Sequence, residues 1–208
     1  GTTYDGVVSY GTLGKDKYWK RKMLEQISDG SSFLDLACGT GILTREIAEK
    51  FPNSKIVGID ITKSYLDVAK ENSSYFENIS FILDDAEEFK LDSKFDCITA
   101  SYLPKYCDPE ILVKNCTAHL KPGGKIIFHD FTYPKNLVVR GLWNLFLTSL
   151  RLVGCFIPSW KDALIGLPKL IRRTKWLESY SDVMKKNGLS VNRQYLTCGA
   201  SAILTGTK

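Results

Sequence analysis

Acidic residues and a glycine-containing loop are spaced in this sequence so that they could bind a cofactor that carries a nucleoside. The apolar run 33–37 ends in the loop 38–41, Cys-Gly-Thr-Gly, and a helical pattern begins at Ile42. The glycines allow a tight turn and the close approach of a ligand, and the first helical turn offers unpaired N–H groups. A second apolar run ends in Asp60, about 20 residues beyond the glycines, where a carboxylate reaches a ribose diol. This pattern predicts a nucleoside-bearing cofactor.

The composition indicates a globular protein of one domain. The chain has 208 residues, of which 44% are hydrophobic and 25% are charged, values that are ordinary for this class. A net charge of +5 permits contact with an anionic surface but does not indicate nucleic acid. The six cysteines form no Cys-x-x-Cys pair, so no metal site is expected, and they suit a core in a reducing compartment. No secretory signal pattern is visible, which favours a cytoplasmic location.

Strands alternate with helices from residue 32 to residue 131, which predicts a parallel sheet with helices on both faces. The strands are expected at residues 32–37, 55–60, 78–83, 95–101 and 125–131, and the helices at 15–28, 42–50, 62–72 and 109–120. In such sheets, ligands bind beyond the carboxyl ends of the strands. A helix at 176–186 and two paired strands, at 189–197 and 200–207, are expected to close the domain.

Residues 136–157 are unusually apolar and depart from this alternation. They are numerous enough to span a bilayer, but polar residues interrupt the run, so a transmembrane helix is not expected. Within a helical lid or insert at about 134–175, the run predicts either a core helix or a cover that accepts an apolar substrate or touches the membrane. The basic face of the 15–28 helix has two similar interpretations, a solvated surface or a contact with anionic headgroups.

The glycine loop resembles motif I of class I S-adenosylmethionine (SAM) methyltransferases, in the form Asp-x-Ala-Cys-Gly-Thr-Gly at residues 35–41. Nearly the whole chain resembles one family among them, the ubiquinone/menaquinone biosynthesis C-methyltransferases. The residues that carry this resemblance are 34–44, 85–87, 95–101, 119–125 and 196–199, with Ser9-Tyr10-Gly11 and Trp19-Lys20 near the start.

The resemblance implies a Rossmann-like class I methyltransferase fold of the α/β class. It has a mostly parallel seven-stranded sheet, an antiparallel C-terminal hairpin and helices on both faces. The implied activity is SAM-dependent C-methylation of a prenylated quinol. Two departures leave the acceptor open: residues 102–106 replace the family's Phe-Gly-x-Arg-Asn, and Asp130-Phe131 replaces Glu-Phe. The alternatives are another apolar small molecule or lipid as acceptor, or a non-enzymatic protein with this fold.

The resemblance also implies which residues hold the cofactor. Asp35 and the glycine loop would face its methionine part and Asp60 its ribose. Asp85 would accept from the adenine amino group, with the Ala86 N–H at a ring nitrogen, although Asp85 could instead cap a helix. The full set of cofactor residues is Tyr10, Asp35, Ala37, Cys38, Gly39, Thr40, Gly41, Asp60, Ile61, Asp85, Ala86 and Ser101.

Asp130 and His129, at the end of the fifth expected strand, are the candidate general bases, because a quinol must lose a proton before its ring carbon attacks. Alternation along a strand lets at most one of them point into the site. His129 could instead be a core histidine and Asp130 a turn cap. Tyr10, Tyr102 and Tyr133 could line a ring pocket. No nucleic-acid partner is expected, and a homodimer is left open.

Overall fold

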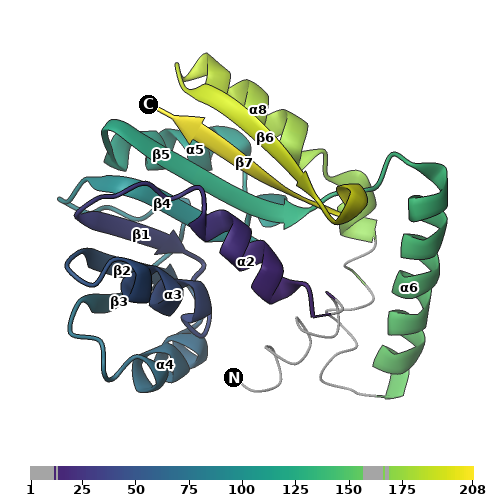
Figure 1. Cartoon of the computed structure of the whole chain (residues 1–208), viewed down its shortest axis with the longest axis horizontal. Coiled ribbons are helices and arrows are strands. Elements are labelled where there is room, and N and C mark those ends of the chain that lie inside the picture. Colours follow the sequence, from purple (N-terminus) through teal and green to yellow (C-terminus); the bar gives the residue numbers. More distant parts are fainter. Residues whose placement is uncertain (1–11, 13, 157–165, 167–168) are drawn as a thin grey trace.

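The protein is built on a seven-stranded sheet with the strand order β3-β2-β1-β4-β5-β7-β6 (Figure 1). The computed structural model describes residues 12, 14–156, 166 and 169–208. The strands are β1 (Ser32–Leu36), β2 (Lys55–Asp60), β3 (Ile79–Leu83), β4 (Phe95–Ser101), β5 (Leu120–Phe131), β6 (Ser190–Leu196) and β7 (Ser201–Thr207). The first five pair in parallel, whereas β7 lies antiparallel between β5 and β6. The predicted parallel sheet with an antiparallel C-terminal hairpin is confirmed.

The central strands are apolar because both of their faces are covered. In β1, residues 33–36 are all buried, and Asp35 is the only ionisable side chain among them. Strands covered on both faces read as continuous apolar runs, so a carboxylate in such a run is costly unless it is hydrogen-bonded. The position of Asp35 therefore points to the end of β1 as the place where the site lies.

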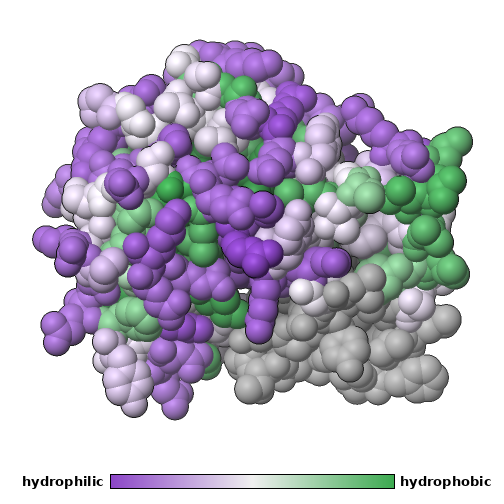
Figure 2. Space-filling model, in the orientation of Figure 1, coloured by the Kyte–Doolittle hydropathy of each residue, from purple (hydrophilic) through white to green (hydrophobic). Residues whose placement is uncertain are grey.

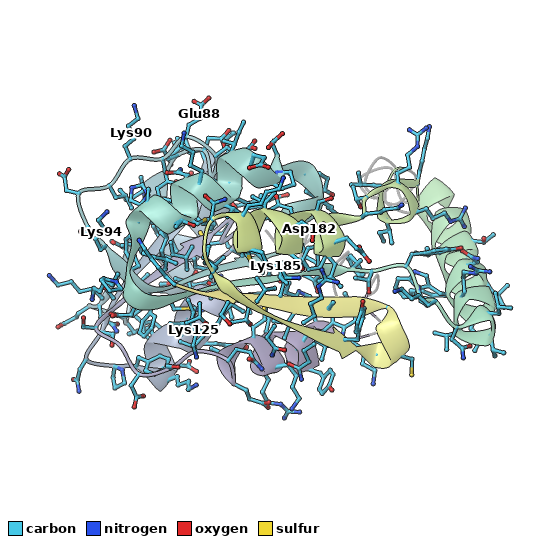
Figure 3. All side chains as sticks on the ribbon, turned by 90° about the horizontal axis from the view of Figure 1, so that it is seen from above. Glu88, Lys90, Lys94, Lys125, Asp182 and Lys185 are labelled. Carbon is cyan, nitrogen blue, oxygen red and sulfur yellow. The ribbon has the colours of Figure 1, made fainter. Side chains whose placement is uncertain are left out.

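Helices cover both faces of the sheet (Figures 1 and 3). They are α2 (Asp16–Leu24), α3 (Ile42–Lys50), α4 (Lys63–Asn72), α5 (Pro109–His119), α6 (Leu137–Phe156) and α8 (Trp176–Lys186), with short 3₁₀ turns η1 (Pro104–Tyr106) and η2 (Thr197–Gly199). One core cluster includes Trp19 of α2 and Ile47 of α3, and the other includes Val113 of α5 and Tyr180 of α8. The two faces thus bury separate apolar cores.

Three element boundaries differ from the sequence expectations. The first helix ends at Leu24 rather than near residue 28. The fifth strand begins at Leu120 rather than at residue 125. In this added stretch the pairing with β4 shifts register and Gly123 adopts a left-handed φ of 75°. The hairpin turn at Gly199 is a 3₁₀ turn rather than a simple reversal.

The apolar segment after β5 forms α6, a continuous helix that lies at one side of the molecule (Figure 1). Hydrophobic side chains cover the part of the surface that α6 presents in Figure 2. None of the described helices has the combination of length and apolar character that crossing a membrane would require.

Candidate functional site

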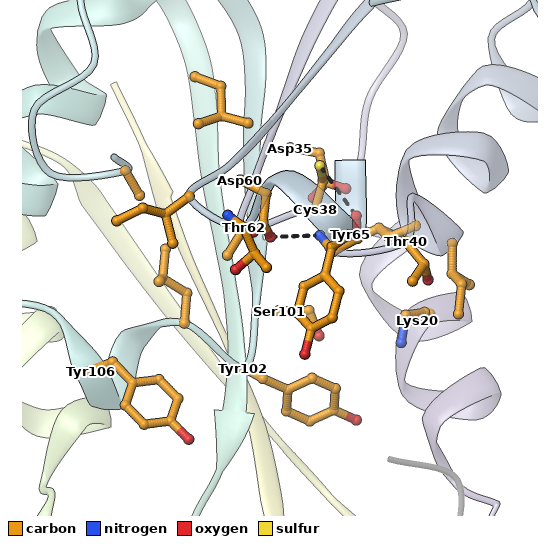
Figure 4. A pocket seen from close by; sticks show the side chains of 18 of the residues that line it. Lys20, Asp35, Cys38, Thr40, Asp60, Thr62, Tyr65, Ser101, Tyr102 and Tyr106 are labelled. Carbon is orange, nitrogen blue, oxygen red and sulfur yellow. Dashed lines mark hydrogen bonds between the residues drawn. The ribbon is translucent and has the colours of Figure 1, made fainter. Parts of the chain in front are cut away.

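A cavity of about 800 Å³ lies beyond the carboxyl ends of β1, β2 and β4, with α2 along one wall (Figure 4). This is the edge at which parallel α/β sheets bind ligands. The residues that line it include Asp35, Ala37, Cys38, Gly39, Thr40, Asp60, Ile61, Asp85, Ala86 and Ser101. Ten of the twelve residues in the predicted cofactor set are thereby brought together. Gly41 is not part of the lining, and Tyr10 lies outside the described residues.

The glycine loop has a backbone that few sequences can adopt. Ala37, Gly39 and Gly41 have positive φ values of 51°, 56° and 78°, a region that most side chains avoid. A Cβ at Gly41 would come within 3.2 Å of Ala69 and Phe81, whereas one at Gly39 would meet nothing within 4 Å. Gly41 is therefore needed for close packing at the start of α3, and Gly39 keeps bare backbone open to a ligand.

The carboxylate of Asp60 is fixed by the loops on either side of it. Its Oδ2 accepts from the Gly39 N–H at 2.8 Å, and its Oδ1 accepts from the Thr62 N–H at 2.8 Å. Each carboxylate oxygen can accept a further hydrogen bond. Asp60 could therefore take both hydroxyls of a ribose without moving, as its place at the end of β2 predicts.

Asp35 is the most perturbed acid that lines the cavity. Its two oxygens accept from Thr44 Oγ1 at 2.7 Å and from Thr99 Oγ1 at 2.8 Å. Burial raises its pKa to about 6, and the two threonine hydroxyls limit that rise. The thiol of neighbouring Cys38 is also buried, and its pKa is raised by that burial. A buried carboxylate of this kind would be stabilised by a cationic ligand group.

Asp85 has a capping role in the structure, and its adenine contact stays a prediction. Its Oδ1 accepts from the Glu87 N–H at 2.8 Å, which caps a turn rather than the helix considered above. Asp85 and Ala86 also line the cavity. The cap fixes the carboxylate in place, and a fixed carboxylate can serve as an acceptor for a ligand donor.

His129 and Asp130 are completely buried, and neither lines the cavity. His129 lies between two serines, with Nδ1 3.0 Å from Ser101 Oγ and Nε2 2.6 Å from Ser201 Oγ. Its pKa is well below the ordinary value, because burial disfavours the imidazolium. The structure therefore gives His129 the core role that was its alternative, although Ser101 connects it to the cavity.

Asp130 is part of a buried ion pair. Its Oδ1 lies 3.0 Å from Lys105 Nζ, and it also accepts from the N–H groups of Lys105 and Phe131. Burial raises its pKa, an effect that Lys105 opposes. A carboxylate with these partners holds η1 against β5, and it does not line the cavity.

A polar cluster at the wall formed by α2 was not predicted from the sequence. The Tyr102 hydroxyl donates to Asp16 Oδ1 at 2.8 Å, and Lys20 Nζ bonds the same oxygen. All three residues line the cavity. Lys20 is only 7% exposed, so the expectation of a solvated or headgroup-facing basic face is wrong for this residue. The i, i+4 spacing of Asp16 and Lys20 in the sequence could have indicated that these two side chains pair.

Tyr102 has an unusual backbone for a large residue. Its φ is 64°, and its N–H donates to the carbonyl of His129 at 2.8 Å. Left-handed conformations in bulky residues are uncommon and gather at functional sites. The ring thereby lies over the cavity, opposite Asp35 and Asp60 and near the ring of Tyr106 (Figure 4).

Comparison with known proteins identifies the family of this chain. A family model described as a methyltransferase domain matches residues 27–150, more than half of the chain. The chain belongs to the methyltransferase-domain family. The methyltransferase is also 29% identical to the ubiquinone/menaquinone biosynthesis C-methyltransferase UbiE of Hahella chejuensis, over 99% of this chain and 86% of that protein.

Solved structures agree with the fold. The N-methyltransferase NodS of Bradyrhizobium japonicum WM9 superposes with a TM-score of 0.64 and 14% identity, over 93% of this chain and 96% of that one. A SAM-dependent methyltransferase of Clostridium acetobutylicum superposes with a TM-score of 0.53 and 26% identity, over 64% and 58% of the two chains. The methyltransferase described here is an enzyme that uses SAM, and the open backbone at Gly39 beside the fixed carboxylate of Asp60 fits that cofactor.

Proposed function

We propose that the methyltransferase transfers a methyl group to a ring carbon of a prenylated quinol. The observation that carries the proposal is that a single cavity contains both the predicted cofactor residues and a largely aromatic and apolar wall. The cofactor residues include the glycine loop and Asp60, and the wall has Tyr102, Leu103, Tyr106 and Cys107. Aromatic walls favour a flat, apolar ring, and the relative from Hahella chejuensis is named for quinone biosynthesis.

The proposed cofactor contacts follow the predicted set. Asp60 takes the ribose, Asp35 and the glycine loop face the methionine part, and Asp85 with Ala86 faces the adenine. Tyr10 remains a predicted contact. SAM supplies an activated methyl group when bound. The protein must then align the acceptor carbon, exclude water and accept a phenolic proton, and alignment alone is worth about 7–11 kcal/mol.

We propose that Tyr102 and Asp16 together accept this proton, in place of the predicted bases Asp130 and His129. A phenol oxygen both donates and accepts, so Tyr102 could take the acceptor's proton while its own proton passes to Asp16, 2.8 Å away. The ring-carbon electrons of the resulting phenolate would form the new C–C bond as the methyl–sulfur bond of SAM breaks, with S-adenosylhomocysteine as the leaving group. Loss of the proton on that ring carbon, with return of a proton to the phenolate oxygen, would then restore the aromatic quinol. His129 would act only indirectly, by orienting Ser101.

A methyl-transfer assay tests the proposed function. The protein is incubated with SAM and a demethylated quinol in detergent micelles, and the product is analysed by mass spectrometry for one added methylene on carbon. The Asp60→Ala variant should weaken SAM binding at least about 10-fold, because it removes charge-assisted hydrogen bonds. Asp67→Ala changes an exposed acid on α4 and is the matched control.

Transfer to quinols in the wild type, with SAM affinity lost only in Asp60→Ala, is the expected result. SAM binding without transfer to any quinol, together with transfer to a lipid or to a soluble phenol, would contradict the proposed acceptor.

We also propose that this enzyme is a cytoplasmic protein that meets its acceptor at a membrane surface. The support lies in α6, the helix that follows β5 in the chain. This helix exposes the side chains of Leu137, Val138, Leu142 and Leu145. In this proposal α6 belongs to the lid or insert at about 134–175 within a single domain. A homodimer is the other association that the sequence left open.

A further inference from the structure

A second cavity, of about 530 Å³, lies between the start of α6, the start of α8 and the corner where β6 meets η2. Its described lining includes three cations, Lys135, Arg172 and Lys175, and one acid, Glu178. Lys135 and Lys175 are both exposed. The cavity is thus positively charged and open to molecules outside the protein.

A fourth cation adds to this charge. The guanidinium carbons of Arg140 and Arg172 each lie 5.9 Å from the centroid of the Tyr133 ring, which lines the cavity. Arg172 also donates to Asn144 of α6 at 2.8 Å, which fixes its position. The ion pairs among the residues that the structure describes include none of these four cations. Among the described residues, four cations face the single acid Glu178, and this net positive charge favours an anionic ligand.

The exposed apolar face of α6 begins at the rim of this cavity. Asn136 lines the cavity and caps α6 by accepting from the N–H groups of Val138 and Val139. The side chains that follow on the outer face are between 64% and 72% exposed: Leu137, Val138, Leu142 and Leu145. Four such residues within three turns form a contiguous apolar face rather than scattered exposed leucines.

We infer that the second cavity binds the phosphate headgroup of an anionic phospholipid while the apolar face of α6 lies in the adjoining acyl region of the same bilayer. The inference rests on the proposed membrane contact and names its lipid. Interfacial helices bind through apolar area together with attraction to anionic lipids, and this surface offers both side by side. A neutral bilayer would satisfy the leucines but would offer the four cations no net negative charge.

Vesicle flotation of the full chain tests the inference. We expect binding to vesicles with equal parts phosphatidylcholine and phosphatidylglycerol to be at least about 10-fold tighter than to phosphatidylcholine alone, and to weaken as salt is added. The Lys135→Gln/Lys175→Gln variant should lose about 10-fold in affinity for the anionic vesicles. Lys70→Gln/Lys90→Gln removes the same charge from exposed sites elsewhere and should retain binding.

The apolar face is tested in the same assay. Leu142→Gln/Leu145→Gln should also lose about 10-fold in binding, whereas Ile111→Gln, at an exposed position on α5, should not. All variants should bind SAM as the wild type does, because none of these residues lines the first cavity.

Equal binding to neutral and anionic vesicles, or equal losses in the two lysine double variants, would overturn the inference. So would a dimer, seen by analytical ultracentrifugation, that the α6 substitutions dissociate without any change in vesicle binding. If anionic vesicles bind as expected but quinols are not methylated, the proposed function fails and the lipid site stands.

Discussion

At the scale of one residue, the burial of Asp35 at the site lowers the stability of the folded protein. Its carboxylate is buried in the central strand and held by Thr44 and Thr99, and its pKa is raised from 3.8 to about 6. The folded state therefore favours the protonated form more than the unfolded state does. The contribution of this group to stability falls as pH rises through the range between these two pKa values and stays low above it.

The Asp35→Asn variant should show this cost. Relative to wild type, its free energy of unfolding should increase by about 3 kcal/mol between about pH 4 and pH 7, while SAM affinity falls. Urea denaturation across this pH range measures the difference. Asp67→Asn, an exposed acid on α4, is the control and should show no such trend. A difference between Asp35→Asn and wild type that stays constant with pH would contradict the account.

The hydroxyl of Tyr102 is the second residue-scale test. Tyr102→Phe keeps the ring and the backbone but removes the donor to Asp16. We expect kcat for the quinol to fall by about 100-fold, in the range of general acid–base effects, with SAM affinity unchanged in titration calorimetry. Tyr75→Phe, at a position that is 95% exposed, is the control. A kcat that stays near the wild-type value would remove the Tyr102–Asp16 pair from the mechanism.

At the scale of the element, the 3₁₀ turn η1 is joined to β5 by a buried ion pair. Lys105 and Asp130 have side chains that are only 3% and 0% exposed. They stand at two of the positions where the sequence departs from the quinone family's pattern, and the structure pairs them with each other. Buried pairs add little net stability when intact, but removing one partner is costly.

Lys105→Met should lower the free energy of unfolding by about 3 kcal/mol, because it leaves Asp130 buried without its partner. Lys105→Met/Asp130→Leu should recover most of that loss. Lys63→Met breaks an exposed pair with Asp67 and should cost less than about 1 kcal/mol. Chemical denaturation of the three variants gives the comparison, and equal losses in the single and double Lys105 variants would refute it.

At the scale of the whole molecule, the predictable features were those that depend only on residues close together in the sequence. The strands, the glycine loop and Asp60 depend on neighbouring residues, so apolar runs and spacing were sufficient to place them. The Asp16–Tyr102 contact joins residues 86 positions apart, and the Lys105–Asp130 pair depends on a 3₁₀ turn that periodicity does not indicate. For this reason Asp130 was predicted at the site and Asp16 was not.

The anchoring of α2 determines how ligands exchange with the solvent. Trp19 is 1% exposed, packs its ring 5.3 Å from that of His129, and donates to Thr197 Oγ1 at 2.8 Å. An outward movement of α2 would break these contacts together, so we expect this helix to stay in place while ligands exchange. We therefore expect SAM and its product to pass by the rim at Ile61 and Tyr106, which are 69% and 66% exposed. Turnover would then depend on how freely these two side chains move aside.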